Sequence, residues 1–185
     1  MQLLSDEQLK QIRNLRPISN SVSNTLLRTY ESEAIRLYLL RVFDADFINT
    51  LIEYNKDNET QTINDHDKKI CKAILNGKIY FSRQGKSDYF TGLIEALLYL
   101  ICARMFMNQQ LIISQNAIKK HNTDVSNQAE TSEVKRLSRD CLNMGLLLLK
   151  DVYKYVKTTE FKNKIKYNGI EELTFAVISC KMIGE

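Results

Sequence analysis

Residues that interrupt regular structure are scarce in this sequence, which has one proline and six glycines among 185 residues. Such a composition favours long helices over many short strands joined by tight turns. Tryptophan is absent, and histidine occurs only at His66 and His121. A metal site needs several converging ligands, usually from closely spaced pairs, and neither histidine has such a neighbour. We therefore expect no metal site and no cofactor.

The sequence also lacks the patterns that mark common catalytic sites. No serine or cysteine lies in a nucleophile-elbow pattern. The run Gly85-Lys86-Ser87 ends like a phosphate-binding loop, but Tyr80 stands where the first glycine of that loop is required. Neither histidine follows an arginine at the spacing that is typical of helical-bundle ribonucleases. We therefore expect a protein without catalytic residues, which is not an enzyme.

Closely spaced cysteine pairs are absent too. Cys71, Cys102, Cys141 and Cys180 lie more than thirty residues apart, and each falls within an apolar helical pattern. Reduced thiols in a helical core explain this spacing better than a disulfide framework does. The first residues, MQLLSDEQLKQIR, lack the basic segment and apolar run of a signal peptide. These features predict an intracellular, cytoplasmic protein.

Long apolar runs are limited to one stretch, TGLIEALLYLICARMFMNQQLIIS at residues 91–114. Its only charges are Glu95 and Arg104, and the charge-free run between them is eight residues long. A membrane span needs about 20 predominantly apolar residues, so we expect no membrane contact. A helix that is apolar on most faces belongs at the centre of a bundle. We therefore expect a buried helix over residues 87–118, with Ser87 as its N-cap.

Helical periodicity extends over most of the remaining chain. Ser5 and Gln8 form a capping-box pattern at the start of the first helix. The run Ile79-Tyr80-Phe81 suits a strand, but one short strand makes no sheet. We expect an all-α fold of seven to nine helices, a multi-helix bundle with polar loops at residues 55–67 and 121–132. Further helices are predicted over about 21–43, 47–52, 70–74, 132–157 and 171–183.

A single all-α domain over residues 1–185 is the predicted organisation. The two polar loops also allow an N-terminal helical half, 1–86, and a C-terminal helical half, 87–185. Acidic pairs such as Glu31 and Glu33 are predicted to be solvated surface or cap charges. The helix over 132–157 is expected to pack along the buried helix. Its predicted packing seam consists of Val134, Leu137, Cys141, Met144, Leu148, Val152 and Tyr155.

One segment carries a marked excess of positive charge. Residues 150–167, KDVYKYVKTTEFKNKIKY, contain six lysines against two acidic residues, and this excess equals the net charge of +4 of the whole chain. Because basic stripes bind phosphates, we predict an RNA-binding surface here. Its candidate residues are Arg139, Lys150, Lys154, Lys157, Lys162, Lys164 and Lys166. The first four share one side of a helix at about 100° per residue.

Aromatic residues are interleaved with these lysines, at Tyr153, Tyr155, Phe161 and Tyr167. Proteins that bind single-stranded nucleic acid combine a basic groove with aromatic side chains on which bases stack. The alternative is a solvated lysine face whose aromatic side chains lie in the core. The residue types alone leave both interpretations open.

The C-terminal part of the chain resembles a viral family. In YNGIEELTFAVISCKMIGE, the run Leu173, Val177-Ile178-Ser179 and Met182-Ile183-Gly184 is similar to the C-terminus of small helical closterovirus proteins. These are the RNA-silencing suppressors of the beet yellows virus p21 type. The segment VKTTEF at 156–161 is similar to a region upstream of that ending. The resemblance implies an all-α, ring-forming oligomer in the host cytoplasm that binds RNA, including small duplex RNA, without catalysis.

Two hypotheses about function follow. The leading one is a non-enzymatic protein, a homo-oligomer, that sequesters single- or double-stranded RNA independently of sequence through phosphate contacts. The alternative is a helical adaptor, such as a phage or bacterial accessory factor, that binds another protein and has no nucleic-acid role. Salt separates them, because phosphate binding weakens steeply as salt rises and a mainly apolar interface does not.

Overall fold

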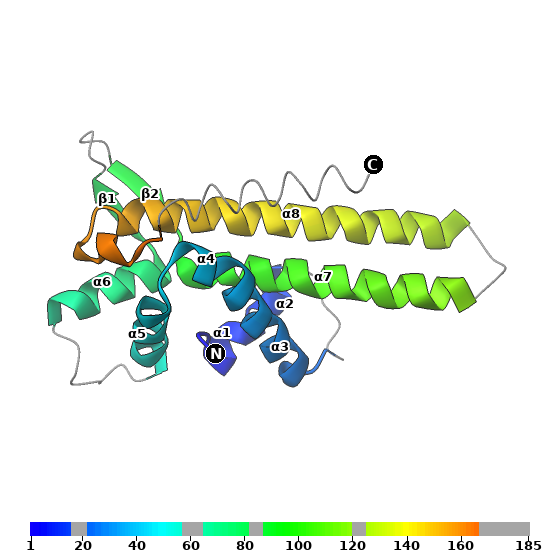
Figure 1. The fold of residues 1–185 in the computed structure, drawn as a ribbon. Helices are drawn as coiled ribbons and strands as arrows, with labels where there is room; N and C mark the ends of the chain where they lie inside the picture. Colours follow the sequence, from blue (N-terminus) through cyan, green and yellow to red (C-terminus); the bar gives the residue numbers. More distant parts are fainter. Residues whose placement is uncertain (16–21, 57–64, 82–86, 120–124, 167–185) are drawn as a thin grey trace.

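A computed structural model of the chain describes residues 1–15, 22–56, 65–81, 87–119 and 125–166. Two long helices, α7 (Leu93–Lys119) and α8 (Val125–Val156), run antiparallel and side by side (Figure 1). Shorter helices from the N-terminal part of the chain lie against α7 (Figure 1). The predicted helical class is therefore confirmed.

The N-terminal part begins with α1 (Asp6–Lys10) and α2 (Ile12–Leu15). The predicted capping box at α1 is confirmed, since the Gln8 amide donates to Ser5 Oγ at 3.2 Å and the Ser5 amide donates to Gln8 Oε1 at 2.8 Å. The long helix expected over 21–43 is one continuous body with an internal π-helical turn. It consists of α3 (Asn24–Ala34), η1 (Ile35–Leu39) and α4 (Leu40–Val42).

A β-hairpin precedes α7, and here the sequence prediction was wrong. After α5 (Ala45–Lys56) and α6 (Asp65–Asn76) come β1 (Lys78–Phe81) and β2 (Ser87–Phe90). The two strands pair antiparallel, with Lys78 opposite Phe90. Ser87 is therefore the first residue of a strand and not a helix N-cap. The missing signal was the second strand, because a strand as short as β1 is stabilised only by the partner with which it pairs.

Two glycines close this hairpin against the helices on either side. Gly77 follows α6 with a φ of 84°, and Gly92 precedes α7 with a φ of 102°. A Cβ on Gly92 would lie 2.4 Å from the Leu75 carbonyl oxygen and 2.5 Å from the Gly77 nitrogen. The end of α6 and the start of α7 thus meet backbone to backbone, which only glycine permits.

The number of separate helices is smaller than expected. Counting continuous helical segments together, the described residues contain six helices of appreciable length, not seven to nine. The helix expected over 171–183 lies outside the described residues. The second polar loop is also shorter than predicted, because α8 begins at Val125 and not near residue 132. A short 3-10 helix, η2 (Glu160–Lys164), follows α8.

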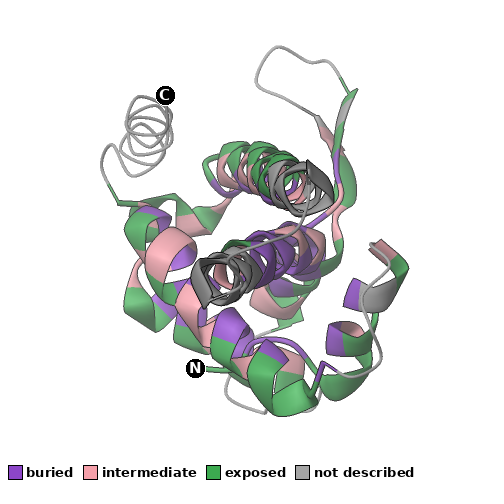
Figure 2. Ribbon diagram, turned by 90° about the vertical axis from the view of Figure 1, so that its right-hand side faces the viewer, coloured by how far each residue is buried: buried purple, intermediate pink, exposed green. Residues whose placement is uncertain are grey.

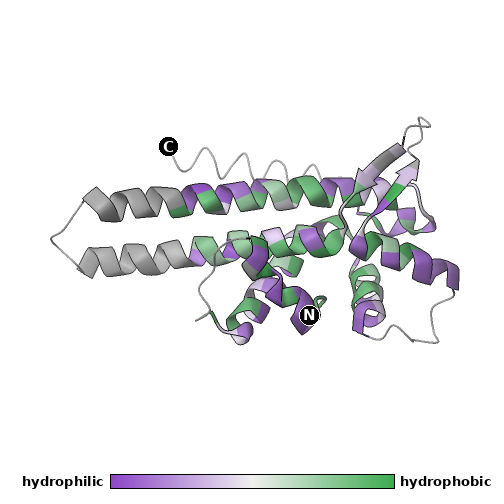
Figure 3. Cartoon of the chain, turned by 180° about the vertical axis from the view of Figure 1, so that it is seen from behind, coloured by the Kyte–Doolittle hydropathy of each residue, from purple (hydrophilic) through white to green (hydrophobic). Residues whose placement is uncertain are grey.

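The prediction of a buried central helix is confirmed for the described side chains of α7. Its residues from Ala96 to Ala103 are almost entirely buried except for Tyr99 (Figure 2). Figure 3 shows this part of α7 as mainly hydrophobic, whereas hydrophilic and hydrophobic residues alternate along α8. No helix of the described part of the chain is long and apolar enough to cross a membrane. Buried residues from Leu3 to Val156 form one cluster, and the predicted domain division stays a prediction.

The predicted seam between α7 and α8 is largely confirmed, since Cys141, Val152 and Tyr155 are buried and Val134, Leu137 and Leu148 pack against the core. Met144 was expected on it but is 42% exposed. Gly145 faces α7 instead, and a Cβ there would lie 2.8 Å from the Leu100 side chain. Ser138 is also buried and donates to the Ala103 carbonyl oxygen at 3.1 Å. Gly145 and the hydrogen-bonded Ser138 therefore lie in the seam. Apolar periodicity had selected the larger residues next to them, Met144 and Leu137.

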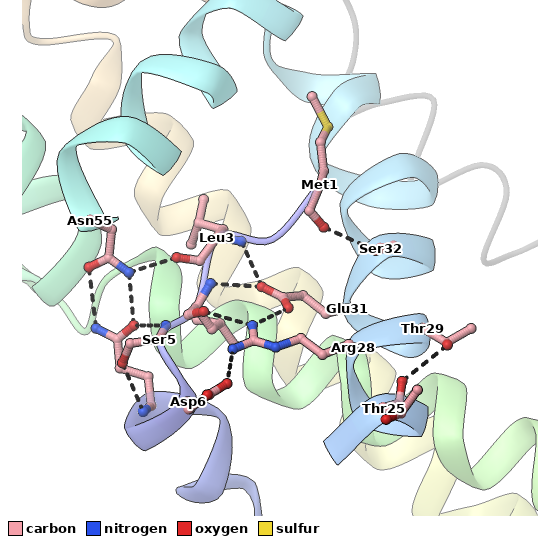
Figure 4. Close-up of polar contacts among 12 residues, drawn as sticks. Met1, Leu3, Ser5, Asp6, Thr25, Arg28, Thr29, Glu31, Ser32 and Asn55 are labelled. Carbon is pink, nitrogen blue, oxygen red and sulfur yellow. Dashed lines mark hydrogen bonds and ion pairs between the residues drawn. The ribbon is translucent and has the colours of Figure 1, made fainter. Parts of the chain in front are cut away.

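The prediction that Glu31 is a solvated charge was wrong. Its side chain is fully buried, and Glu31 Oε1 accepts hydrogen bonds from the amides of Leu3 and Leu4, both at 2.7 Å (Figure 4). Arg28 donates to Glu31 Oε2 at 2.7 Å and also pairs with Asp6. Burial alone would lower the pKa of Arg28, but its hydrogen bonds to Asp6 and Glu31 outweigh burial and raise that pKa. This cluster fixes the N-terminal segment to α3.

Two further polar contacts hold the N-terminal part in place. Asn55 at the end of α5 donates to the Leu3 carbonyl oxygen at 2.6 Å (Figure 4). Glu33 accepts a hydrogen bond from Arg104 on α7 at 2.9 Å, so it too is paired and not simply solvated. These pairs join residues far apart in sequence. Local spacing on one helix therefore carried no sign of them.

Candidate functional site

The predicted basic face exists on α8 as a row of exposed side chains. Arg139, Lys150 and Lys154 lie on α8, and Lys157 follows its last residue. All four are exposed. At about 1.5 Å of rise per residue, the row from Arg139 to Lys157 is roughly 27 Å long. Lys135 and Arg136 are also exposed and extend the positive charge toward the start of the helix.

Two of these cations have partners within the chain. Lys154 Nζ lies 2.7 Å from Asp151 Oδ1. Lys157 Nζ lies over the ring of Tyr153, 4.4 Å from its centroid. Both contacts are on the surface, where ion pairs contribute little stability, so neither prevents these lysines from binding an external group. Arg139 and Lys150 make no ion pair with any residue that the structure describes.

The remaining three predicted residues lie on a different segment. Lys162 and Lys164 are exposed on η2, and Lys166 follows it. Lys166 Nζ donates to the Leu40 carbonyl oxygen at 2.5 Å. The Lys166 amide also donates to the Val42 carbonyl oxygen at 2.9 Å. The segment therefore packs along the junction of α4 and α5, and its lysines do not continue the α8 row.

Two of the proposed stacking residues are occupied in the core. Tyr155 is 7% exposed and stacks on Phe90, with ring centroids 4.5 Å apart. Burial raises the pKa of its hydroxyl. Phe161 packs on Phe47 with centroids 5.2 Å apart. For these two residues the interpretation of aromatic side chains in the core is confirmed, while Tyr167 lies outside the described residues.

The sequence did not predict the apolar part of this face. Met144 is 42% exposed and Leu147 is 55% exposed, one helical turn apart on α8. They lie between Arg139 and Lys150 along the helix. The only available signal was the helical angle of Leu147, which places it on the side of Lys154 and away from the buried Val152. At about 100° per residue, Leu147 lies roughly 60° and Met144 roughly 120° from Lys150 around the helix axis, so the apolar pair borders one side of the basic row.

Histidine and cysteine residues do not assemble a site in the described residues. No group of three or more His, Cys, Asp or Glu residues there could hold a metal ion. His66 Nε2 lies 3.5 Å from Glu160 Oε1 and joins α6 to η2. Cys71 is buried, and burial together with the nearby Asp67 raises the pKa of its thiol to about 11. Such a thiol is protonated and a poor nucleophile near neutral pH.

The fold and this face define a helical protein built on a long α7–α8 pair that presents a mixed basic and apolar surface. The chain belongs to a family of unknown function (DUF6712), whose model matches residues 48–169. The matched region begins within α5 and contains every residue of the basic row. No curated protein and no solved structure matches the chain significantly. The resemblance to closterovirus suppressors stays a prediction.

Proposed function

We propose that this protein is a non-enzymatic adaptor that binds another protein through the solvent side of α8. The observation that carries the proposal is the exposed apolar pair Met144 and Leu147 beside the basic row. Protein interfaces place apolar side chains at their centre, with methionine and arginine enriched, and surround them with a polar rim. On α8 the basic row borders the exposed apolar pair on one side and would form part of such a rim.

Charge indicates the chemistry of the partner. Over residues 134–157, six exposed cations stand against Asp140 and Asp151. Asp151 is already paired with Lys154. A partner with acidic groups around an apolar contact would complement this face, because opposite potentials speed association and exclude like-charged surfaces. We therefore propose an acidic protein surface as the partner.

Replacing Met144 and Leu147 together by serine tests the adaptor proposal. We expect the variant to fold normally and to lose, by roughly tenfold or more, the capture of a specific protein from extracts of the source cells, because the centre of an interface carries most of its binding energy. Capture is measured by quantitative mass spectrometry after nuclease treatment. The matched control is Leu26→Ser on α3, which removes an equally exposed leucine (42%) from another surface. Capture that is insensitive to the double substitution would contradict the proposal.

RNA binding is the second candidate function, and the exposure of all seven predicted cations favours it. Arg139, Lys150, Lys154 and Lys157 would contact successive phosphates along the helix, whatever the base sequence. The burial of Tyr155 leaves less aromatic surface for stacking, so phosphate contacts would carry this binding. A homo-oligomer, and a role as a viral suppressor of RNA silencing in the host cytoplasm, belong to this candidate and rest on the C-terminal resemblance.

Replacing Lys150, Lys154 and Lys157 by glutamine tests RNA binding. If RNA is the ligand, the slope of log affinity against log salt should flatten by roughly two to three, because each phosphate contact contributes about 0.7 to 0.9 to that slope. Gel shifts with single- and double-stranded RNA and DNA at two salt concentrations measure it. A control with the same charge change replaces the exposed Lys10, Lys56 and Lys72. Equal slopes for the two triple variants would contradict RNA binding by this row and leave the adaptor as the remaining candidate function.

A further inference from the structure

A cavity of about 400 Å³ lies where α2, the end of α6 and the start of α7 meet. Its apolar floor is formed by Leu75, Ile94 and Leu98, which are all almost completely buried. The exposed side chains of Gln11 and Asn14 from the α2 region lie at its rim. Ligand sites of small molecules are concave, largely apolar and about 300 to 1,000 Å³ in volume. The cavity therefore has the size of such a site, and its lining combines polar and apolar side chains in similar measure.

The wall of this cavity contains a buried polar atom without a partner. Thr91 Oγ1 is inaccessible to solvent and makes no hydrogen bond, alone among the buried side-chain atoms of the described residues. A buried hydroxyl is nearly always hydrogen-bonded, and each exception calls for an explanation. Thr91 lines the cavity and precedes Gly92, where the backbones of α6 and α7 are in contact. Its position is therefore fixed by the fold.

The other polar side chains of the wall are one carboxylate and the amides of Gln11, Asn14 and Asn76. Glu95 is the single charged residue among those lining the cavity, and it makes no ion pair with any residue in the described ranges. The Asn76 side-chain NH2 group donates a hydrogen bond to the Lys72 carbonyl oxygen at 3.2 Å. The side-chain oxygen of Asn76 is not used in this bond and can accept one from a ligand. A wall with one carboxylate that has no ion-pair partner in the described ranges, together with amide and hydroxyl oxygens, suits a cation that carries N–H donors.

From these observations we infer that the cavity binds a small organic cation, a primary amine or guanidinium with an apolar body. The ammonium or guanidinium group donates to the Glu95 carboxylate, and rotation of the Thr91 side chain brings its otherwise inaccessible hydroxyl to the same group. The apolar body lies on Leu75, Ile94 and Leu98. This site is separate from Met144 and Leu147 on α8, so it does not depend on the proposed adaptor function.

Three probes that share one apolar body test the charge preference. They are phenethylamine, the neutral 2-phenylethanol and the anion phenylacetate. Binding to the full chain is measured by titration calorimetry and by chemical-shift changes of the Thr91 and Ile94 amides. Phenethylamine should bind at least roughly tenfold more tightly than either analogue, because a hydrogen bond to a charged group is stronger than a neutral one.

Variants assign the binding to the two acceptors. Glu95→Gln keeps the side-chain shape and should weaken phenethylamine roughly ten- to hundredfold while leaving 2-phenylethanol unchanged. Thr91→Val should weaken the amine by a smaller factor. Glu53→Gln, an exposed acid on α5, is the control and should have no effect. Equal affinity for the three probes, unchanged amine binding by Glu95→Gln, or no binding of any probe at millimolar concentration would overturn the assignment.

Discussion

Replacing Glu31 by alanine should lower the free energy of unfolding by about 3 to 5 kcal/mol, the usual cost of removing one partner from a buried ion pair. The carboxylate is fully buried and accepts from the Leu3 and Leu4 amides and from Arg28. Its removal leaves two backbone N–H groups without an acceptor, and each such group costs about 1 to 3 kcal/mol. Asp6 still pairs with Arg28, which limits the loss.

Urea denaturation followed by circular dichroism measures this change, and hydrogen exchange of the Leu3 and Leu4 amides reports where it acts. Both amides should exchange faster in the variant, by at least the factor by which the substitution lowers the equilibrium constant for folding. The control is Glu53→Ala, an exposed residue of α5, which should change stability by no more than about 0.5 kcal/mol. If Glu31→Ala and Glu53→Ala unfold at the same urea concentration, the buried carboxylate does not stabilise the N-terminal segment.

Gly92→Ala should destabilise the protein by about 3 kcal/mol or more. The backbone there has a φ of 102°, which costs an L-residue about 1 to 3 kcal/mol. The new Cβ would also lie 2.4 Å from the Leu75 carbonyl oxygen, so the ends of α6 and α7 must separate. Forcing extra volume into a packed site costs about 1 to 3 kcal/mol in addition. Thermal and urea unfolding measure the sum.

Gly145→Ala provides the matched comparison, because it adds the same methyl group to a helical glycine. Its Cβ would lie 2.8 Å from the flexible Leu100 side chain, which can move, and 3.2 Å from the Ala96 carbonyl oxygen. The gain of about 1 kcal/mol from replacing glycine within a helix offsets the crowding. We expect a net change within about 1 kcal/mol. Equal destabilisation by the two substitutions would show that crowding, and not the positive φ, decides the effect.

Local patterns in the sequence predicted the helices because they depend on neighbours three or four residues away. The capping box at Ser5 and the burial of the described side chains of α7 both follow from such short spacings. The same reasoning placed Arg139, Lys150, Lys154 and Lys157 on one exposed side of α8, as the structure does. Helical periodicity sufficed for these features.

The packing seam shows where periodicity reaches its limit. Apolar spacing selected Met144, whereas the structure buries Gly145 against Leu100 and Ser138 against Ala103. A glycine or a serine contributes nothing to an apolar pattern, yet each allows two helices to approach closely. Because Gly145 faces α7, the preceding residue Met144 points outward. Together with Leu147 it forms the apolar centre of the proposed interface.

The sequence by itself determined the helical class, the central helix and the basic row, since each is a property of consecutive residues in one element. Tertiary structure alone decided the pairing of β1 with β2, the burial of Glu31 and the cavity beside Thr91 and Glu95. The last two join segments that are distant in the chain, and the hairpin needs a partner strand that a single short apolar run does not reveal. A carboxylate has the same local pattern whether water or two distant amides solvate it, so its burial is fixed only when the N-terminal segment packs on α3.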